Sequence, residues 1–297
     1  MTLVAAIDCG TNSIKLLVAD LPRVLVRESR VVRLGQGVDE TGRLADDALA
    51  RTFAAVEEFA TTIRAHDVPV ERVRFCATSA ARDAANARVF VDGVRERLGV
   101  TPVVLSGMEE AALVFDATTM LDPPPPAPAL AVDIGGGSTE LVLGGAEQAV
   151  SMDIGSVRLH ERHLAGDPPS AAEWDRCRRD VDDHLDGCGL DLATAQSVVG
   201  TSGTVKTLAC GVLDLPFYDR DRIDGAVLGV DETLAFAERL RAMTVAQRRA
   251  LPYMHPGRAD VIGAGSLIWT RVLERAEVAS YVVSEADILY GIARTVG

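Results

Sequence analysis

Two stretches of nine residues decide the fold of this chain: Asp8-Cys9-Gly10-Thr11-Asn12-Ser13-Ile14-Lys15-Leu16 and Asp133-Ile134-Gly135-Gly136-Gly137-Ser138-Thr139-Glu140-Leu141. They align without a gap, and Asp, Gly, Ser and Leu coincide. An apolar run flanks each stretch on both sides, which predicts two β-hairpins. Because the second stretch follows about one domain's length after the first, we interpret the chain as a duplicated α/β fold. We expect its two hairpins to face each other across a cleft.

The rest of the chain alternates between strand-like and helix-like segments. The 3–4 spacing of apolar residues predicts a helix over 46–66, and a second helix is predicted over 86–98 with Asn86 as its cap. Further strands are predicted at 24–34, 72–77, 103–105, 197–201 and 281–283. Further helices are predicted at 108–121, 157–164, 171–185, 202–213, 231–243, 257–275 and 286–296.

A proline-rich run predicts where the two domains meet. Asp122-Pro123-Pro124-Pro125-Pro126-Ala127-Pro128 suits neither a helix nor a central strand, and polyproline geometry makes it a stiff connector. We therefore predict one domain over 1–122 and a second over 128–284. The last segment, 285–297, is expected to cross back and pack on the first domain.

Composition places the chain among globular proteins rather than disordered ones. Of its 297 residues 48% are hydrophobic and 25% are charged, and this length suits two domains. The formal net charge is −13. Since no cluster of Lys and Arg forms a basic face, a nucleic-acid partner is not expected. A polyanion bound by backbone amides and a metal is compatible with that charge.

Targeting signals and cysteines bear on where the protein acts. No apolar run reaches the roughly 18–20 residues that a membrane span needs, and the N-terminus has no signal-peptide pattern. Five cysteines at irregular spacing are typical of reduced thiols, so we expect a cytoplasmic protein with no membrane partner. Cys9 is interpreted as a small buried strand residue.

Three loops are candidates for binding phosphate. Gly135, Gly136, Gly137, Ser138 and Thr139 offer backbone amides and two hydroxyls, although a loose hairpin turn is the alternative. Thr11, Asn12 and Ser13 form the weaker repeat of that loop. Ser202, Gly203 and Thr204 open a predicted helix, where amides receive an anion or where Ser202 only caps the helix. Lys206 on that helix is interpreted as solvated.

Carboxylates beside these loops indicate a divalent cation. Asp133 ends one strand and Glu140 lies on its partner, so the two would repel a phosphate unless Mg²⁺ or Mn²⁺ bridged them. Asp8, the repeat mate of Asp133, is a third candidate ligand. The alternative is that Asp133 caps its own turn.

Two further residues have candidate roles in hydrolysis. Glu110 lies in the pair Glu109-Glu110 at the start of a predicted helix and is a candidate for activating water. Acidic residues also favour helix N-termini for structural reasons alone. Arg82 follows a strand end and is suited to clamp a phosphate bidentately, or else to form a surface ion pair with Asp83.

Taken together, these residues resemble the exopolyphosphatase and guanosine pentaphosphate phosphatase family, within the actin, Hsp70 and sugar-kinase superfamily. The resemblance covers nearly the whole chain, and the octet Asp133–Glu140 beside Ser106–Leu113 is its most specific part. Its other segments are 8–16, 77–86, 200–204 and Arg258-Ala259-Asp260. The resemblance implies two ribonuclease H-like domains.

The resemblance also implies a mechanism and a substrate. Glu110 would be the general base that activates water, Asp133 and Glu140 would organise Mg²⁺, and Arg82, Ser13 and the loop amides would hold phosphates. The implied reaction releases terminal phosphate from inorganic polyphosphate. Removal of the 5′-terminal phosphate of guanosine pentaphosphate is the close alternative. A sugar or acetate kinase and a non-catalytic phosphate or nucleotide sensor are alternatives of other classes, and a homodimer is a family-level expectation.

Some positions depart from the family's pattern. Ser202 replaces a glycine, and Thr11 and Lys15 replace Ser and Arg in the first loop. Residues 284–291 lack the Gly-Leu-Arg-Glu core of the family's last motif. This departure argues against a contribution of the final helix to the site.

Overall fold

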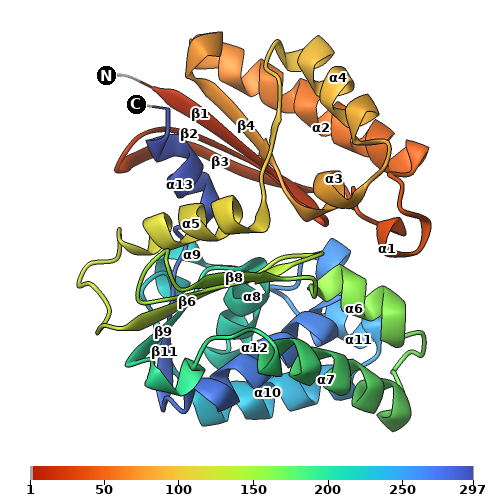
Figure 1. The fold of residues 1–297 in the computed structure, drawn as a ribbon, viewed down its shortest axis with the longest axis vertical. Coiled ribbons are helices and arrows are strands. Elements are labelled where there is room, and N and C mark those ends of the chain that lie inside the picture. Colours follow the sequence, from red (N-terminus) through yellow and green to blue (C-terminus); the bar gives the residue numbers. More distant parts are fainter. Residues whose placement is uncertain (1–2, 297) are drawn as a thin grey trace. The chain divides into compact units, whose positions relative to one another are not determined.

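The computed structural model describes residues 3–296, which form two compact units. Unit 1 contains the residues up to 117 together with those from 288 onward, and unit 2 contains residues 118–287. Figure 1 draws both units as a ribbon. Among residues 3–296 no helix is both long and apolar enough to cross a bilayer.

Unit 1 is built on a five-stranded sheet of order β3-β2-β1-β4-β5. The strands are β1 (Val4–Cys9), β2 (Ser13–Asp20), β3 (Arg23–Val31), β4 (Val73–Ala77) and β5 (Val103–Val104). The first three form an antiparallel meander, and β4 and β5 continue the sheet parallel to β1.

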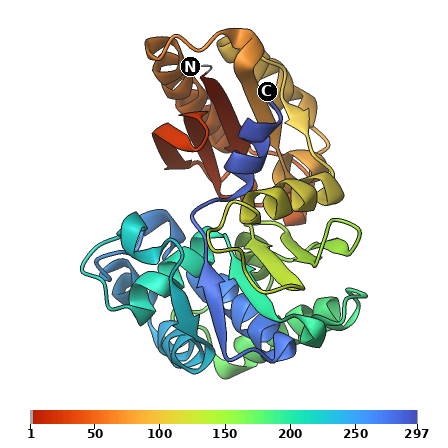
Figure 2. The ribbon, with the colours of Figure 1, turned by 90° about the vertical axis from the view of Figure 1, so that its left-hand side faces the viewer.

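Helices cover both faces of this sheet because its side chains alternate between two apolar clusters. Ala5 and Ile7 belong to the cluster under α2 (Asp46–Ala65) and α4 (Ala87–Leu98), which lie side by side in Figure 1. Val4 and Ala6 belong to the opposite cluster, with Val114 of α5 (Gly107–Thr118) and with α13 (Ile288–Arg294). Figure 2 shows α13 beside the first sheet. Two short helices complete the unit, α1 (Val38–Thr41) and α3 (Ser79–Asp83).

Unit 2 repeats this sheet topology. Its strands are β6 (Ala129–Ile134), β7 (Thr139–Leu143), β8 (Ala149–Met152), β9 (Ser197–Gly200), β10 (Val227–Gly229) and β11 (Ser280–Val283). The order β8-β7-β6-β9-β11 matches β3-β2-β1-β4-β5 strand for strand, with the same antiparallel meander and the same two parallel strands, and β10 adds one edge strand. The prediction of a duplicated α/β fold is therefore confirmed.

Helices of unit 2 share one core with the second sheet. They are α6 (Ser156–His163), α7 (Ala171–Asp186), α8 (Gly203–Val212), α9 (Arg220–Ile223), α10 (Val230–Ala242), α11 (Val245–Arg249) and α12 (Ile262–Ala276). At the core's centre Trp269 of α12 packs edge-on against Tyr281 of β11, with ring centroids 4.9 Å apart. The two strands that the sequence did not predict, β8 and β10, are only four and three residues long.

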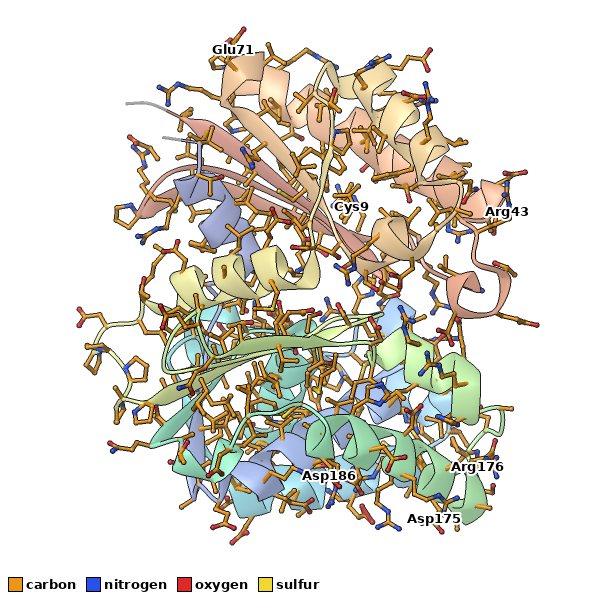
Figure 3. All side chains as sticks on the ribbon, viewed as in Figure 1. Cys9, Arg43, Glu71, Asp175, Arg176 and Asp186 are labelled. Carbon is orange, nitrogen blue, oxygen red and sulfur yellow. The ribbon has the colours of Figure 1, made fainter. Side chains whose placement is uncertain are left out.

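Cys9 lies at the end of β1 and is fully buried, as predicted. Figure 3 shows it inside unit 1, whereas the labelled side chains of α7, Asp175, Arg176 and Asp186, lie at the surface. Burial, and secondarily the charge of Asp8, raises the pKa of the Cys9 thiol well above its ordinary value. All five cysteines are free thiols.

Two local predictions need correction. The Asn86 side chain does not cap α4; its amide instead forms two hydrogen bonds with the backbone of Leu44 (2.8 and 3.0 Å), which lies far away in sequence. The helix predicted over 257–275 begins only at Ile262. The segment before it forms a short 3₁₀ turn, Pro256–Arg258, which leaves Arg258 outside the helix.

We expect the start of α7 to give unit 2 a pH-dependent stability. The Glu173 carboxylate accepts hydrogen bonds from the Ser170 hydroxyl and amide and from the amides of Gly166 and Ala165, and these lower its pKa to about 2. Since the folded-state pKa lies below the unfolded-state value of about 4.3, this stabilisation is complete above that value. It declines as the pH falls towards the folded-state pKa.

The variant Glu173→Gln tests this. We expect its melting temperature to fall below that of the wild type at neutral pH, with the difference shrinking between about pH 5 and pH 3. Asp175→Asn, an exposed substitution on the same helix, is the control. A difference for Glu173→Gln that stays constant over this pH range would contradict the assignment.

Candidate active site

The first hairpin loop, residues 10–12, joins β1 to β2. The Gly10 amide closes it by donating to the Ser13 carbonyl (2.9 Å), and the carbonyls of Thr11 and Asn12 accept amides from segment 32–35. The Thr11 hydroxyl and the Asn12 side-chain oxygen are buried and have no hydrogen-bond partner among residues 3–296. A buried polar group left unsatisfied costs about 1–3 kcal/mol, so this loop has groups that a ligand would satisfy.

The second hairpin loop, residues 135–138, has the same construction. The Gly135 amide donates to the Ser138 carbonyl, again at 2.9 Å, and the carbonyls of Gly135 and Gly136 accept amides from segment 156–158. Arg158 holds the loop further, since its Nε donates to the Gly137 carbonyl (2.8 Å). The sequence repeat is therefore also a repeat of backbone hydrogen bonds.

Backbone amides without a protein acceptor are the groups that can receive an anion. Among residues 3–296, the amides of Thr11, Asn12, Gly136 and Gly137 donate to no acceptor. At the start of α8 the amides of Gly203 and Thr204 also donate to no acceptor within the described residues, as at any helix start, whereas the Val205 amide donates to the Ser202 hydroxyl. Successive unpaired amides of this kind form concave sites for phosphate.

Two of the hydroxyls predicted to bind phosphate have structural partners. Thr139 is fully buried, and its hydroxyl donates to the Ile154 carbonyl (2.8 Å). Ser202 caps α8, because its hydroxyl accepts the amide of Val205 (3.2 Å). The Ser202 hydroxyl keeps its own proton for a further hydrogen bond, whereas the proton of Thr139 is already used.

The register of the hairpins places a charged residue opposite an aspartate in each. Asp8 is paired with Lys15, and Asp133 with Glu140. Side chains directly opposite each other share one face of the sheet, with Cβ atoms about 4.5–5.5 Å apart. In unit 1 the Lys15 Nζ lies 3.1 Å from Asp8 Oδ2, so Asp8 already has a cationic partner. In unit 2 two carboxylates share these positions, and Glu140 accepts a hydrogen bond from Ser151 (2.8 Å).

The neighbours Glu109 and Glu110 have different environments. Glu109 accepts the Ser106 amide and hydroxyl (both 2.8 Å), and the Ser106 hydroxyl accepts the Glu109 amide (3.3 Å), which makes a capping box for α5. These bonds lower the pKa of Glu109. Glu110 is 8% exposed and its Oε2 lies 3.4 Å from Nη1 of Arg82. The structural role of an acidic helix start therefore belongs to Glu109.

Arg82, on α3, links three groups of unit 1. Its Nη1 donates to the Leu105 carbonyl (3.0 Å) and to Glu110 (3.4 Å), and its Nε lies 3.9 Å from Asp83. The sequence did not decide between an ion pair of Arg82 with Asp83 and a contact of Arg82 with phosphate. The structure adds the contact with Glu110, which sequence spacing did not predict.

Arg258 is a candidate residue whose position the sequence did not predict. A Cβ at Gly203 would lie 1.8 Å from Arg258 Nη1, so the guanidinium lies against the first residue of α8. It makes no hydrogen bond or ion pair with any residue from 3 to 296. The Pro256-Gly257 pair, which breaks the predicted helix before Arg258, is the signal that could have placed it.

Lys206 is not solvated as predicted. Its side chain is 4% exposed, and its Nζ lies 3.5 Å from both Glu285 Oε2 and Asp287 Oδ2 and donates to the Glu285 carbonyl (3.2 Å). Tyr218 and Arg220 also contact the Glu285 carboxylate. Segment 284–287, which differs from the family's last motif, therefore binds the Lys206 side chain inside unit 2.

In each unit the candidate residues follow three parallel strands. In unit 1 the first loop, α3 and segment 106–110 follow β1, β4 and β5. In unit 2 the second loop, segment 201–204 and segment 284–287 follow β6, β9 and β11. The equivalence extends to single bonds: the amide of Leu105 donates to Ala77, and that of Ser284 to Gly200, both at 2.9 Å. The carboxyl ends of parallel strands are where α/β sheets bind ligands.

We predict that Gly155→Ala weakens phosphate binding by unit 2. A Cβ at Gly155 would lie 2.5 Å from the Gly136 carbonyl, so it would displace the second loop. Titration calorimetry with tripolyphosphate and Mg²⁺ should give an affinity on the order of tenfold weaker, which corresponds to about 1.4 kcal/mol. Gly145→Ala is the matched control, because a Cβ there meets nothing within 4 Å. Equal affinities in the two variants would show that the second loop does not bind phosphate.

Known proteins share the sequence pattern and the fold of this chain. The model of the Ppx/GppA phosphatase family matches residues 13–292. Exopolyphosphatase 2 of Mycobacterium tuberculosis is 44% identical over 99% of this chain and 98% of its own length. The crystal structure of an exopolyphosphatase-like protein superimposes with a TM-score of 0.94 at 43% identity, covering 98% of both chains. A family member from Aquifex aeolicus gives a TM-score of 0.81 at 28% identity, covering 99% of this chain and 97% of its own.

The family match over residues 13–292 begins at β2, directly after the first hairpin loop, and includes the capping box of α5, the second loop and the start of α8. The M. tuberculosis relative aligns over nearly its full length, and the exopolyphosphatase-like crystal structure shares the fold over 98% of both chains. On these grounds the chain belongs to the Ppx/GppA phosphatase family.

Proposed function

We propose that this chain is an exopolyphosphatase, which releases orthophosphate from the end of inorganic polyphosphate. The observation that carries the proposal is the pair of matched hairpin loops, whose amides at Thr11, Asn12, Gly136 and Gly137 have no protein acceptor. A linear chain of phosphates offers an anionic group to each such set of donors. The near full-length likeness to a relative named Exopolyphosphatase 2 supports the same substrate class.

The donor set of unit 2 fits Mg²⁺, or Mn²⁺. Asp133 and Glu140 lie directly opposite each other on one face of the sheet, and no group of three or more His, Cys, Asp or Glu suited to a metal exists among residues 3–296. Mg²⁺ takes one or two carboxylates and completes its shell with water and phosphate oxygens. When bound, it would neutralise phosphate charge beside the second loop. Asp8 is the less favoured ligand, since Lys15 already pairs with it.

Different residues of the chain bind the phosphates and activate the attacking water. The loop amides, Ser13 and Arg82 hold the phosphates, and Arg258 supplies a further cation at the start of α8. Glu110 accepts a proton from a water whose oxygen attacks the terminal phosphorus. The bond from that phosphorus to the bridging oxygen breaks, and orthophosphate and a chain one phosphate shorter leave. A positioned general base contributes about 10²–10⁴-fold, and the loops supply charge stabilisation.

We expect the enzyme to act in the cytoplasm, where free thiols such as its five cysteines stay reduced. Guanosine pentaphosphate carries the same terminal phosphoanhydride on a nucleoside. It is therefore the competing substrate that the assay has to include.

The test of function is phosphate release from long-chain polyphosphate with Mg²⁺. We expect Glu110→Gln to lower kcat by about 10²–10⁴-fold while polyphosphate still binds. Glu109→Gln is the matched control: glutamine also serves at this position of a capping box, so turnover should stay near that of the wild type. Release from guanosine pentaphosphate alone would replace the proposed substrate, and release from neither would leave a phosphate sensor.

The metal assignment makes a separate prediction. Asp133→Asn removes one carboxylate, so the Mg²⁺ concentration at half-maximal activity should rise on the order of tenfold or more, and chelation should abolish wild-type activity. Asp153→Asn, an exposed change in the same unit, should leave the Mg²⁺ dependence unaltered. An unchanged Mg²⁺ dependence in Asp133→Asn would assign the metal to other residues.

A further inference from the structure

The contact between Arg82 and Glu110 deepens the proposed function and rests on it. We propose that Arg82 is a positioning residue for the base. One part of its guanidinium holds the Glu110 carboxylate, and another part holds the phosphate that is attacked. Arg82 thereby sets the separation between the base and the phosphorus, in addition to binding phosphate.

The guanidinium is anchored to a rigid part of unit 1. Its Nη1 donates to the Leu105 carbonyl at 3.0 Å, and the Leu105 amide in turn donates to Ala77, the last residue of β4, at 2.9 Å. The same Nη1 lies 3.4 Å from Glu110 Oε2. Arg82 therefore connects the carboxylate to the sheet through the strand ends rather than through a mobile loop.

The guanidinium also has donor capacity left for a ligand. An arginine carries five N–H donors in a planar fork, and the partners of Arg82 engage only Nη1 and Nε. The second terminal nitrogen, Nη2, makes no hydrogen bond or ion pair with any residue from 3 to 296. The side chain is 24% exposed, so an anion can reach it.

The helix that carries Arg82 lies against the first loop. The Thr78 amide at the start of α3 donates to the Cys9 carbonyl (3.2 Å), and the Arg82 amide donates to the Thr78 carbonyl (3.1 Å). A Cβ at Gly35 would meet both Thr11 (2.3 Å) and Ala80 (3.1 Å), which shows how closely α3 and the loop pack. A phosphate on the unpaired loop amides is thus held beside the same short helix as the guanidinium.

The duplicated fold provides a comparison within the chain. In unit 2, Lys206 likewise follows the second parallel strand and contacts a carbonyl and carboxylates after the third, at Glu285 and Asp287. The side chains of Lys206, Glu285 and Asp287 are each 4% exposed, so the Lys206 ammonium is enclosed by the protein and is not accessible to a ligand. In unit 1 the equivalent cation, Arg82, is partly exposed. From this difference in exposure we infer that Arg82 also binds a ligand.

A double-mutant cycle in the full chain tests the proposal with polyphosphate and Mg²⁺. We expect Arg82→Gln to raise KM and to lower kcat on the order of 10–100-fold, since a small misplacement of reacting groups costs that much. In the Glu110→Gln background the same change should raise KM equally but alter kcat less than about twofold, because no base remains to be misplaced.

Three results would overturn the proposal. An equal loss of kcat in both backgrounds would mean that Arg82 acts on the phosphate alone, and no loss of kcat in the wild-type background would mean that it contributes only to binding. If Glu110→Gln by itself keeps full turnover, the base of the proposed function is wrong, and the positioning role is overturned with it.

The controls separate positioning from folding. Arg88→Gln removes the same charge from a side chain that is 92% exposed on α4 and should leave KM and kcat unchanged. Arg82→Lys retains the charge but has only a point donor in place of the fork. We expect it to recover part of the KM and little of the kcat, and its melting temperature should match that of the wild type. Should Arg82→Gln fold poorly, Arg82→Lys takes its place in the cycle.

Discussion

In both hairpins one backbone hydrogen bond of 2.9 Å, from a glycine amide to the carbonyl of the serine three residues on, closes the loop at the end of the central strand. Closing the turn in this way leaves the amides between the two partners without an acceptor. Segments 32–35 and 156–158 bind the loop carbonyls, so these amides are held in place before any ligand arrives. The candidate site depends on that constraint, because preorganised donors need no rearrangement to receive charge.

The duplication has kept the backbone and changed the side chains. At the position opposite the strand-end aspartate, unit 1 has Lys15 and unit 2 has Glu140. The first hairpin therefore neutralises its own aspartate, whereas the second gathers two carboxylates on one face of the sheet. One topology thus places an ion pair at these positions in unit 1 and two carboxylates at the same positions in unit 2.

The sequence predicted those parts of the structure that depend on local pattern. The hairpins, the duplicated topology and the buried state of Cys9 followed from apolar runs, glycines and the internal repeat. Two of the predictions that were wrong involve long-range contacts. Asn86 was expected to cap its own helix, but bonds Leu44. Lys206 was expected in solvent, but ion-pairs with residues about eighty positions further on. No local pattern carries such information.

In the candidate site, too, local spacing predicts some features, whereas others appear only in the folded chain. Glu109 and Glu110 are adjacent and chemically alike, but Glu109 forms the capping box with Ser106 and Glu110 contacts Arg82. That box can be recognised from the spacing of Ser106 and Glu109 alone. The contact between Glu110 and Arg82 needed the fold, since it joins segments that follow two different strands.

The place of α13 in unit 1 has a consequence for biosynthesis. Ile288, Leu289 and Ile292 of α13 pack against the first sheet, whose strands are synthesised long before them. All of unit 2 is synthesised between these two parts. Unit 2 can therefore fold while the chain is still growing, whereas the apolar face of the first sheet around Val4 and Leu17 is covered only in part, by α5, until α13 has been synthesised. A chain without α13 would expose more of that face to chaperones or to aggregation.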